Sequence, residues 1–464
     1  MSLTTQSRPA ADADAEVGPG AGPDAGSDAG PFDRAAFRAF LDRLRPGARE
    51  REAHRRLLFD EVRELQSLGF GALRLPREHG GAGVSLEELF GLLVDLSAAD
   101  SNLGHLVRGH VAFVETLLLT GLRDGQELDA SQERWVARLR RGDLVGNAQS
   151  ERRELGDLGT RLERGEDGGW RVTGTKYYTT GSIYADWIHL AALDGDERVG
   201  VTLDASLPGV RSVDDWDGFG QPLTGSGTTT FEAVPVLPED ITRHEPDDET
   251  WPYLGAVFQL VLLATVAGIA QAALDDTVEY TRGRRRTFGH AGEHAPREDP
   301  LVQAVVGRLS AAAHAARAIV LHNARALDGF VEAVRDGRAA QGAARSVQLD
   351  VFRAQQVVLP LVLDATSELF EVGGASATST ARGLDRHWRN ARTVASHNPA
   401  VQRAAAIGQL ELDGTLPQWR APGAPPAAGD QADAQPGDQP GDDGGAPADA
   451  PADAPAAPAA GQPR

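Results

Sequence analysis

Cysteine is absent from the 464 residues of this chain, and lysine occurs once, as Lys176. Without a thiol, disulfide bonds, thiolate nucleophiles and cysteine-ligated metal centres are excluded. The remaining basic residues are arginines, and 67 acidic residues outnumber the 46 basic ones, so the formal net charge is −21. This acidic balance argues against nucleic acid or an anionic membrane surface as a partner.

Long apolar runs and targeting signals are also missing. No apolar run approaches the ~20 residues of a membrane span, and the Ala/Asp/Gly/Pro-rich N-terminus lacks the basic start and apolar core of a secretory signal. We therefore expect a soluble, cytoplasmic protein. Residues 1–30 and the acidic Ala/Pro/Gly/Asp-rich residues 421–464 have too few large apolar side chains to offset the entropy of ordering, which predicts two disordered tails.

Between the tails, hydrophobic periodicity divides the chain into three regions. Apolar residues in 31–142 keep a 3.6-residue rhythm, which predicts an N-terminal helical domain. Residues 143–248 hold short β-rich runs between Asp-Gly and Gly-Gly turns, which predicts a middle antiparallel β-domain. Long helical patterns return in 249–420, and nearly continuous apolarity over 260–273 indicates a helix buried on several sides. The prediction is an α+β protein that ends in a four-helix bundle.

A basic segment close to the end of the folded region combines several chemical groups. Arg386, Arg389 and Arg392 recur at every third residue, so in a helix they share one side. A hydroxyl, an imidazole and an amide then follow in a row before a proline: Ser396, His397 and Asn398. On spacing alone, this segment is equally typical of a solvated helix end whose cations complement the helix dipole.

Several motifs resemble those of the acyl-CoA dehydrogenase superfamily, in the same order along the chain. They are Asn147-Ala-Gln-Ser-Glu, Gly174-Thr-Lys-Tyr-Tyr-Thr-Thr-Gly-Ser, Arg286-Thr-Phe-Gly followed by Asp299-Pro-Leu-Val-Gln, and Glu371-Val-Gly-Gly. Each motif alone is common in turns and hairpins. Together, and with helices on both sides of a small β-domain, they extend the resemblance over about residues 32–415. The family's fold and its flavin site are what this resemblance implies.

The departures from the dehydrogenase pattern are as informative as the matches. Dehydrogenases of this family remove a substrate proton with a glutamate, but the matching position nine residues after Arg389-Asn-Ala is Asn398. The family's alternative position for this base falls near Phe258 and Gln259. An amide cannot serve as a general base at neutral pH. The His387-Trp-Arg-Asn-Ala-Arg-Thr pattern with its Ser-His-Asn-Pro end instead resembles the two-component flavin monooxygenases on this fold, of which dibenzothiophene monooxygenase and sulfur-acquisition oxygenases are the best-known members.

That resemblance implies a set of cofactors and partners. Reduced FMN would be the cofactor, with FAD as an alternative, and a C4a-hydroperoxyflavin formed with O₂ would oxygenate a small organic substrate of the organosulfur or aromatic class. No Gly-x-Gly-x-x-Gly follows a predicted strand, so the electrons would come from a separate NAD(P)H-dependent flavin reductase. A homotetramer is implied as well. The alternatives are an acyl-CoA dehydrogenase or oxidase with a displaced base, and a non-catalytic protein that retains the fold.

Site residues follow from the same resemblance, position by position. The candidate catalytic residues are His397, Ser182 and His110, because neutral donors and an imidazole can hydrogen-bond an oxygenated flavin without adding negative charge. The candidate flavin-contacting residues are Asn147, Ser150, Tyr178, Thr180, Trp216, Arg286, Phe288, Gly373, Gly374, Arg392, Ser396 and Asn398. For His110 the alternative is a histidine satisfied within an apolar helix. His290 and His294 are more typical of a loop than of a metal pair, and no metal site is predicted.

Overall fold

The computed structural model describes residues 32–120, 127–152, 158–243, 250–285 and 295–415. Both predicted tails, and the candidates Arg286, Phe288, His290 and His294, lie outside the described residues. The N-terminal region of the described chain is helical, as its periodicity predicts. Its elements are α1 (Arg34–Leu44), η1 (Arg45–Gly47), α2 (Ala48–Ala53), α3 (Phe59–Ser67), η2 (Phe70–Ala72), η3 (Arg77–His79), α4 (Leu86–Ala99), α5 (Ser101–Leu106), α6 (Arg108–Thr120) and α7 (Ala130–Arg140).

The middle region forms a sheet of strands and one short 3-10 turn. The elements are β1 (Val145–Ala148), β2 (Arg161–Arg164), β3 (Trp170–Lys176), β4 (Trp187–Asp194), β5 (Glu197–Asp204), β6 (Val210–Ser212), β7 (Thr229–Val236), η4 (Pro238–Asp240) and β8 (Ile241–Arg243). The strand order is β6-β7-β3-β2-β4-β5-β8, and β1 pairs with β4 outside this path. The inner face of the sheet packs its own apolar cluster around Val172, Ile188 and Val201.

The prediction of an antiparallel sheet is wrong in one respect, because the sheet is mixed. The pairs β2–β3, β3–β7, β4–β5, β5–β8 and β6–β7 are antiparallel. However, β1 and β2 both run parallel to β4. Hairpin signals are local and identify neighbours joined by a tight turn, whereas a parallel pair joins segments that are distant in the chain. The turn pattern therefore could not show the β1–β4 pairing.

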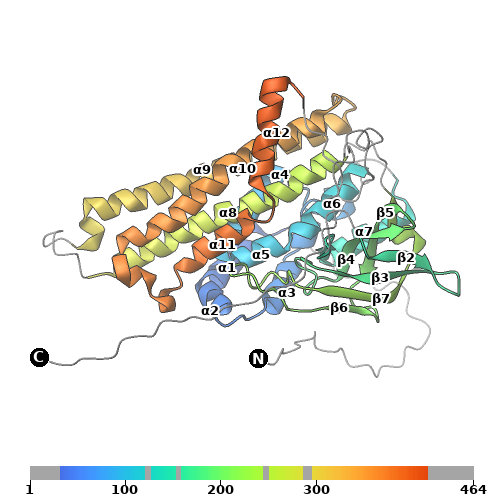
Figure 1. Cartoon of the computed structure of the whole chain (residues 1–464), viewed down its shortest axis with the longest axis horizontal. Coiled ribbons are helices and arrows are strands. Elements are labelled where there is room, and N and C mark those ends of the chain that lie inside the picture. Colours follow the sequence, from blue (N-terminus) through green and yellow to red (C-terminus); the bar gives the residue numbers. More distant parts are fainter. Residues whose placement is uncertain (1–31, 121–126, 153–157, 244–249, 286–294, 416–464) are drawn as a thin grey trace, which may run out of the picture. The chain divides into compact units, whose positions relative to one another are not determined.

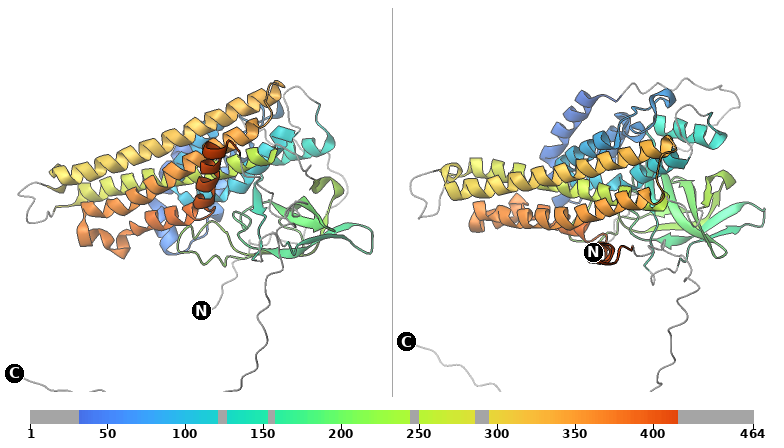
Figure 2. Two further views of the ribbon diagram at one scale, coloured as in Figure 1. Left: turned by 45° about the horizontal axis from the view of Figure 1, so that its top comes forward. Right: turned by 90° about the horizontal axis from the view of Figure 1, so that it is seen from above.

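The C-terminal region is helical again and contains the long helices that the periodicity predicts. Its elements are α8 (Thr250–Gly283), η5 (Pro296–Glu298), α9 (Pro300–Arg335), α10 (Ala343–Glu368), η6 (Leu369–Val372), η7 (Gly374–Thr378), η8 (Thr380–Arg382), α11 (Asp385–Ala395) and α12 (Ala400–Asp413). Helices α8, α9 and α10 pack against one another, and α11 packs on α8 and α10 (Figure 1). Both views of Figure 2 show α8, α9 and α10 side by side.

Helix α8 is the central helix of this arrangement. It contacts α4, α6, α9, α10 and α11, and nearly every residue from Leu260 to Ala273 is buried, as the continuous apolarity predicts. Two described helices, α8 and α9, are long and apolar enough to cross a membrane, with mean hydropathies of 2.0 and 1.3. In α8, however, 89% of that apolar window is covered by the rest of the protein. The apolar residues of α8 are therefore part of the protein core.

Candidate active site

Helices α5 and α6, called the α5–α6 wall below, lie between the sheet and the C-terminal helix α8. Every residue from Ser101 to Val111 is buried. Gly109 allows this wall to touch the sheet, because a Cβ atom there would lie 2.6 Å from the Cβ atom of Asn147. Gly181 allows a second close approach from the sheet side, since its Cβ would lie 2.4 Å from the carbonyl oxygen of Leu106. The polar side chains carried by this wall thus lie beside strand β1.

On the sheet side, three of the predicted residues come together. The backbone N–H of Asn147 donates to the carbonyl oxygen of Thr180 at 3.4 Å, and the Ser182 hydroxyl donates to the Asn147 carbonyl oxygen at 3.5 Å. Gly146 permits this approach, because its Cβ would lie 2.6 Å from the Cα atom of Ser182. The Asn147 side chain is 9% exposed, and no described residue hydrogen-bonds its amide. This amide is therefore free to bind a ligand.

An aromatic pair lies next to this cluster. The rings of Tyr178 and Trp216 meet edge to face, with 6.0 Å between their centroids. Tyr178 is 47% exposed and has a φ of 63°, a left-handed conformation that is strained for a tyrosine. The Trp216 indole N–H donates to the carbonyl oxygen of Gly220 at 3.0 Å, which fixes the ring. An exposed aromatic surface held in a strained conformation is suited to stacking against a planar ring system.

On the helical side, His397 follows α11 and faces His105 of α5. Their rings meet edge to face with 5.9 Å between centroids. Although residue 397 as a whole is exposed, burial of the His397 imidazole by surrounding protein, followed by the charge of Arg108, holds its pKa well below the usual range. His397 is consequently a neutral imidazole at physiological pH.

The tautomer of His105 follows from its hydrogen bonds. The Gln221 amide N–H donates to the Ser101 hydroxyl at 2.9 Å, so its carbonyl oxygen turns to His105 Nδ1 at 3.1 Å. His105 Nδ1 must then carry the proton. The other ring nitrogen, Nε2, is buried without a hydrogen-bond partner among the described residues. Burial lowers the pKa of His105 to about 4, so Nε2 is a bare acceptor beside His397.

The two positions where dehydrogenases of the resembling family place their base meet in this structure. The Asn398 amide donates to the side-chain oxygen of Gln259 at 2.9 Å, and the Gln355 amide donates to the Asn398 backbone carbonyl at 3.3 Å. The two positions that the resemblance matches to the dehydrogenase base therefore lie together, and both carry amides. Two arginines lie beside them: Arg108 donates to the carbonyl of Phe258, and Arg403 donates to Gln259.

The residues of this region fit a flavin, which is the cofactor implied by the resemblance. The unpartnered Asn147 amide and the Ser182 hydroxyl are neutral polar groups on one side, and the Tyr178–Trp216 pair offers an aromatic surface. Two glycines, Gly109 and Gly146, hold the backbone closer than any side chain would allow. Amides, hydroxyls and aromatic rings suit the polar edge and the face of an isoalloxazine. Within the described residues, no cluster of three His, Asp or Glu side chains is placed to ligate a metal.

Other predicted residues lie apart from this cluster or have other contacts. Both ring nitrogens of His110 are engaged by backbone: Nδ1 accepts from Val145 N–H at 3.3 Å and Nε2 faces the Gly71 carbonyl at 3.1 Å. Neither nitrogen remains for a ligand, which favours the alternative of a satisfied histidine. Ser150 is exposed at the end of β1. Gly373 packs against Tyr280, where a Cβ would lie 2.5 Å from the hydroxyl, and Gly374 begins η7 with a φ of 50°.

The arginines of α11 have separate partners. Arg386 pairs with Asp276 at 2.5 Å, and Arg389 pairs with Asp385 at 2.8 Å. Arg392 instead donates to the Ser396 hydroxyl from Nε at 3.1 Å and from Nη2 at 3.0 Å. The structure thus brings the two predicted cofactor contacts Arg392 and Ser396 together, without an acidic partner for either among the described residues.

Several residues of the site were not predicted. His105, Arg108, Gln221 and Arg403 lie next to predicted residues, but no motif marks them as ligand contacts. A signal did exist for the first two, because His105 and Arg108, together with His110, are the polar residues in an otherwise apolar run from Leu103 to Val114. Gln221 ends the Asp215-Trp-Asp-Gly-Phe-Gly-Gln segment that resembles the monooxygenase subgroup, although no role was assigned to it. For Arg403 there was no signal, since its importance depends on contacts between distant segments.

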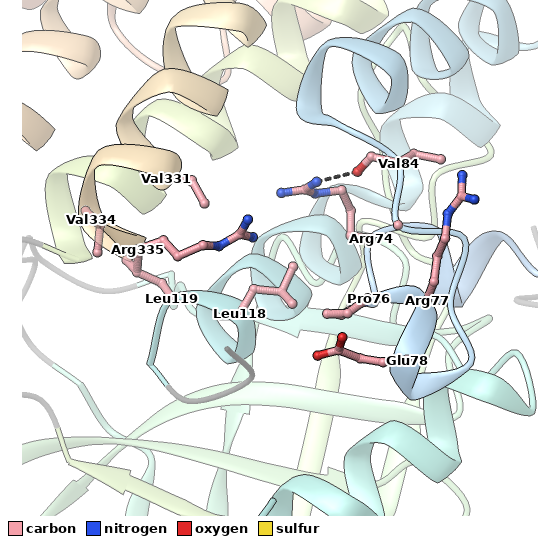
Figure 3. Close-up of a pocket in the computed structure, with 11 residues that line it drawn as sticks. Arg74, Pro76, Arg77, Glu78, Val84, Leu118, Leu119, Val331, Val334 and Arg335 are labelled. Carbon is pink, nitrogen blue, oxygen red and sulfur yellow. Dashed lines mark hydrogen bonds between the residues drawn. The ribbon is translucent and has the colours of Figure 1, made fainter. Parts of the chain in front are cut away.

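A pocket of about 330 Å³ lies elsewhere, between the η3 turn, the end of α6 and the end of α9 (Figure 3). Its wall includes Arg74, Pro76, Leu118 and Val331. The Arg74 side chain already has partners within the protein, because it pairs with Glu115 at 2.6 Å and donates to the Val84 carbonyl. None of the predicted site residues lines this pocket.

Comparisons with known proteins show similarity to one family over most of the chain. Residues 33–143 match the family described as acyl-CoA dehydrogenase, N-terminal domain, and residues 260–402 match its C-terminal domain. A dibenzothiophene monooxygenase of Rhodococcus erythropolis is 30% identical over 404 residues, which cover 82% of this chain and 94% of that protein. A probable FMNH2-dependent monooxygenase of Pseudomonas putida, SfnC, is 28% identical and covers 76% of this chain and 88% of its own length.

A solved structure shares both sequence and fold with the chain. TdsC from Paenibacillus sp. A11-2, determined with FMN and indole, is 26% identical with a TM-score of 0.74. The alignment covers 82% of this chain and 98% of TdsC. The similarity therefore extends over most of the chain rather than over one of its three regions.

Proposed function

This chain belongs to the acyl-CoA dehydrogenase family, within its two-component flavin-dependent monooxygenases, and from this premise we propose how its residues divide the work of oxygenation. The observation that carries the proposal is the hydrogen bond between Asn398 and Gln259 at 2.9 Å. Both positions correspond to the dehydrogenase base, and neither can accept a proton at neutral pH. Proton abstraction next to a thioester therefore lacks its base in this site.

Reduced FMN, when bound, supplies the two electrons with which O₂ yields one oxygen atom for the substrate and one for water. The protein has to hold the cofactor, exclude water and manage protons. Asn147 offers an unpartnered neutral amide on the sheet side, beside the hydroxyls of Ser182 and Thr180, and Trp216 offers a fixed ring. Because none of these groups carries a negative charge, they can donate to electron-rich oxygen and nitrogen atoms without repelling them.

His397 is the candidate for proton transfer. Burial and the charge of Arg108 lower its pKa, so the ring is neutral and can take a proton from a reacting group and return it. His105 Nε2 lies on the neighbouring ring without another partner among the described residues. We assign His105 the role of a positioning residue, since Gln221 fixes its tautomer and its ring limits the rotation of His397.

The remaining partners belong to the same proposal. Electrons arrive as reduced flavin from a separate NAD(P)H-dependent reductase in the cytoplasm, since the sequence carries no dinucleotide fingerprint after a strand. The chain assembles as a homotetramer. Helix α9 supports assembly, because only 33% of its apolar window is buried within one chain and large uncovered apolar surfaces mark interfaces. Mass measurement by light scattering tests this: a monomeric mass at micromolar concentration would contradict it.

The function is tested by reconstituting the two components. Purified protein is supplied with a flavin reductase, NADH, FMN and ¹⁸O₂, together with dibenzothiophene, indole and a panel of aromatic carboxylates and sulfinates. The expected result is a product that contains one ¹⁸O atom, formed in proportion to the NADH consumed. Release of all reducing equivalents as hydrogen peroxide with every substrate would overturn the proposal. Anaerobic bleaching of bound flavin by an acyl-CoA would favour a dehydrogenase instead.

A further inference from the structure

Arg108 is a buried cation without an acidic partner in the described structure. Its side chain is only 8% exposed. Its Nε donates to the Phe258 carbonyl at 3.1 Å, and its guanidinium lies over the Phe258 ring, 4.4 Å from the centroid. The two terminal nitrogens have no hydrogen-bond partner among the described residues. A buried guanidinium normally pairs with a carboxylate because desolvation of the charge is costly.

Arg403 of α12 brings a second positive charge to the same place. Its Nη1 donates to the side-chain oxygens of Gln259 and Gln355, the latter at 2.8 Å. Its guanidinium lies 4.4 Å from the centre of the Phe352 ring. These neighbours are two neutral amides and an apolar ring, so they satisfy one nitrogen without neutralising the charge. The two arginines are close enough that burial, together with the charge of Arg403, lowers the pKa of Arg108 to about 9.

The groups that surround the two arginines confirm the excess of positive charge. The titratable neighbours on the adjoining elements are His105 of α5 and His397 after α11, both neutral at physiological pH because burial lowers their pKa values. The polar neighbours Gln259, Gln355 and Asn398 are amides. No ion pair joins Arg108 or Arg403 to a carboxylate within the described residues. Any ligand that brings a negative charge would relieve this imbalance.

We propose that Arg108 and Arg403 form an oxyanion-binding pair that selects an organic acid, a carboxylate, sulfinate or sulfonate, as the substrate of this site. The terminal nitrogens of Arg108 form a planar fork that matches two oxygens of such a group. Phe258 and Phe352, which carry the two guanidinium groups, provide apolar contacts for the rest of the molecule. The proposal rests on the proposed function, because it treats the bound acid as the molecule that is oxygenated.

The position of the pair argues for the substrate rather than the cofactor. Arg108 and Arg403 are anchored to Phe258 and Gln259, which are consecutive residues at the position of the dehydrogenase base. A base has to touch the substrate. The residues that fit the flavin, Asn147 and Ser182, lie against Gly109 and Gly146 instead, so the arginine pair lies beside the flavin contacts rather than among them.

Binding of matched probes tests this without turnover. Protein loaded with FMN is titrated calorimetrically with benzoate, benzenesulfinate and benzenesulfonate, and with neutral benzamide, which has nearly the same shape as benzoate. We expect at least one of the three acids to bind about 10- to 100-fold more tightly than benzamide, the range of one charge-assisted hydrogen-bonded contact. The acid that binds best identifies the substrate class. Equal binding of benzoate, both sulfur acids and benzamide would overturn the proposal, as would inorganic sulfate that binds as tightly as benzenesulfonate.

Variants assign the effect to the arginine pair. Arg108→Leu and Arg403→Leu should each remove the preference for the acid and leave the dissociation constant of FMN unchanged. Arg345→Leu removes an exposed arginine of α10 and should change neither, which makes it the matched control. Loss of FMN binding with retained acid binding in Arg108→Leu would show that the pair serves the cofactor and would overturn the proposal. Tight acid binding without ¹⁸O incorporation would instead refute the proposed oxygenation while the anion site stands.

Discussion

Two sets of buried arginines in this protein differ in one respect, the presence of an acid. Arg51 is 5% exposed and donates from Nε and Nη2 to Asp100 at 3.0 and 2.9 Å. Burial alone would lower the pKa of Arg74, but its ion pair with Glu115 raises it. Arg108 is as deeply buried, yet no described carboxylate meets it. The first set holds the N-terminal helices together, whereas the second keeps a charge that only a ligand can balance.

This difference separates stability from function. A buried ion pair is costly to break but contributes little when both partners are present. An unpaired buried charge lowers stability and persists where it has a task, as strained and destabilised groups do at active sites. The two sets can therefore be told apart by what happens when one charge is removed or added.

Removal of Asp100, the acid that pairs with Arg51, should have the largest effect on stability. Asp100→Asn leaves Arg51 buried without its partner, and we expect the free energy of unfolding to fall by about 3–5 kcal/mol. Urea unfolding followed by circular dichroism measures this. The matched control is Asp95→Asn, which breaks the exposed pair with Arg317 and should cost less than about 1 kcal/mol. Equal losses in the two variants would contradict the distinction between the two sets.

Beside the arginine pair Arg108 and Arg403, His397→Ala should impair the reaction rather than folding. Loss of a group that transfers protons typically slows a reaction by about 100-fold or more, so the yield of oxygenated product per NADH should fall and hydrogen peroxide should rise. FMN should still bind. His314→Ala, at an exposed position of α9, is the control. An unchanged product yield would show that His397 is structural.

His110 distinguishes a structural histidine from the histidines beside the arginine pair. His110→Gln should lower the free energy of unfolding by about 1–3 kcal/mol, because two buried backbone contacts lose their partner. Burial lowers the pKa of His110 to about 4, whereas the unfolded residue titrates near 6.5. Stability should therefore fall as the pH drops from 6.5 to 4, and less steeply in the variant.

That pH dependence is measured by urea unfolding at a series of pH values. The exposed His54→Gln variant controls for the substitution itself. If His110→Gln removed product formation while leaving stability and its pH dependence intact, His110 would belong to the catalytic group after all.

Gln259→Glu should place an acid beside the arginine pair, which has no acidic partner among the described residues. The new carboxylate would lie within reach of Arg403, which already donates to this side chain. We expect the benzoate affinity of the protein to fall about 10-fold, with a gain in stability of up to about 1 kcal/mol. Gln303→Glu, at an exposed position of α9, is the control. Tighter binding of benzoate by Gln259→Glu would contradict the anion site.

Arg108→Leu should have the smallest effect on the fold, and its sign is diagnostic. Because the charge is buried without an acid, its replacement by an apolar side chain should leave the free energy of unfolding unchanged or raise it by about 1 kcal/mol. Urea unfolding beside the Arg345→Leu control measures the difference. A loss as large as that of Asp100→Asn would show that Arg108 has a hidden partner and belongs to the structural set.

Much of the architecture could be predicted from the sequence. The long apolar run of α8, the helical rhythm on both sides of the sheet and the turn-rich middle region are local patterns, and local patterns follow from side-chain periodicity. The parallel pairing of β1 with β4 was missed, because register between distant strands is decided by packing rather than by turns. Motif order identified the family, since it compares this chain with others and needs no geometry.

Only part of the candidate site could be predicted from the sequence. Asn147, Thr180, Ser182, His397 and Asn398 were predicted because they lie within motifs, and they remain predictions. His110 belongs to the same apolar helix as Arg108, and only contacts distinguish them: the imidazole is satisfied by backbone, and the guanidinium is not neutralised.

The sequence by itself determined the class of chemistry. The absence of cysteine and the amide at position 398 are properties of residue identity. They exclude thiol chemistry and argue against the dehydrogenase base without any coordinates. The tertiary structure alone decided which of the 45 arginines are balanced by acids. A charge in a sequence is neither paired nor unpaired, because its energy depends on burial and on neighbours contributed by other segments. Arg108 becomes a binding group only where α5, α8, α11 and α12 meet around it.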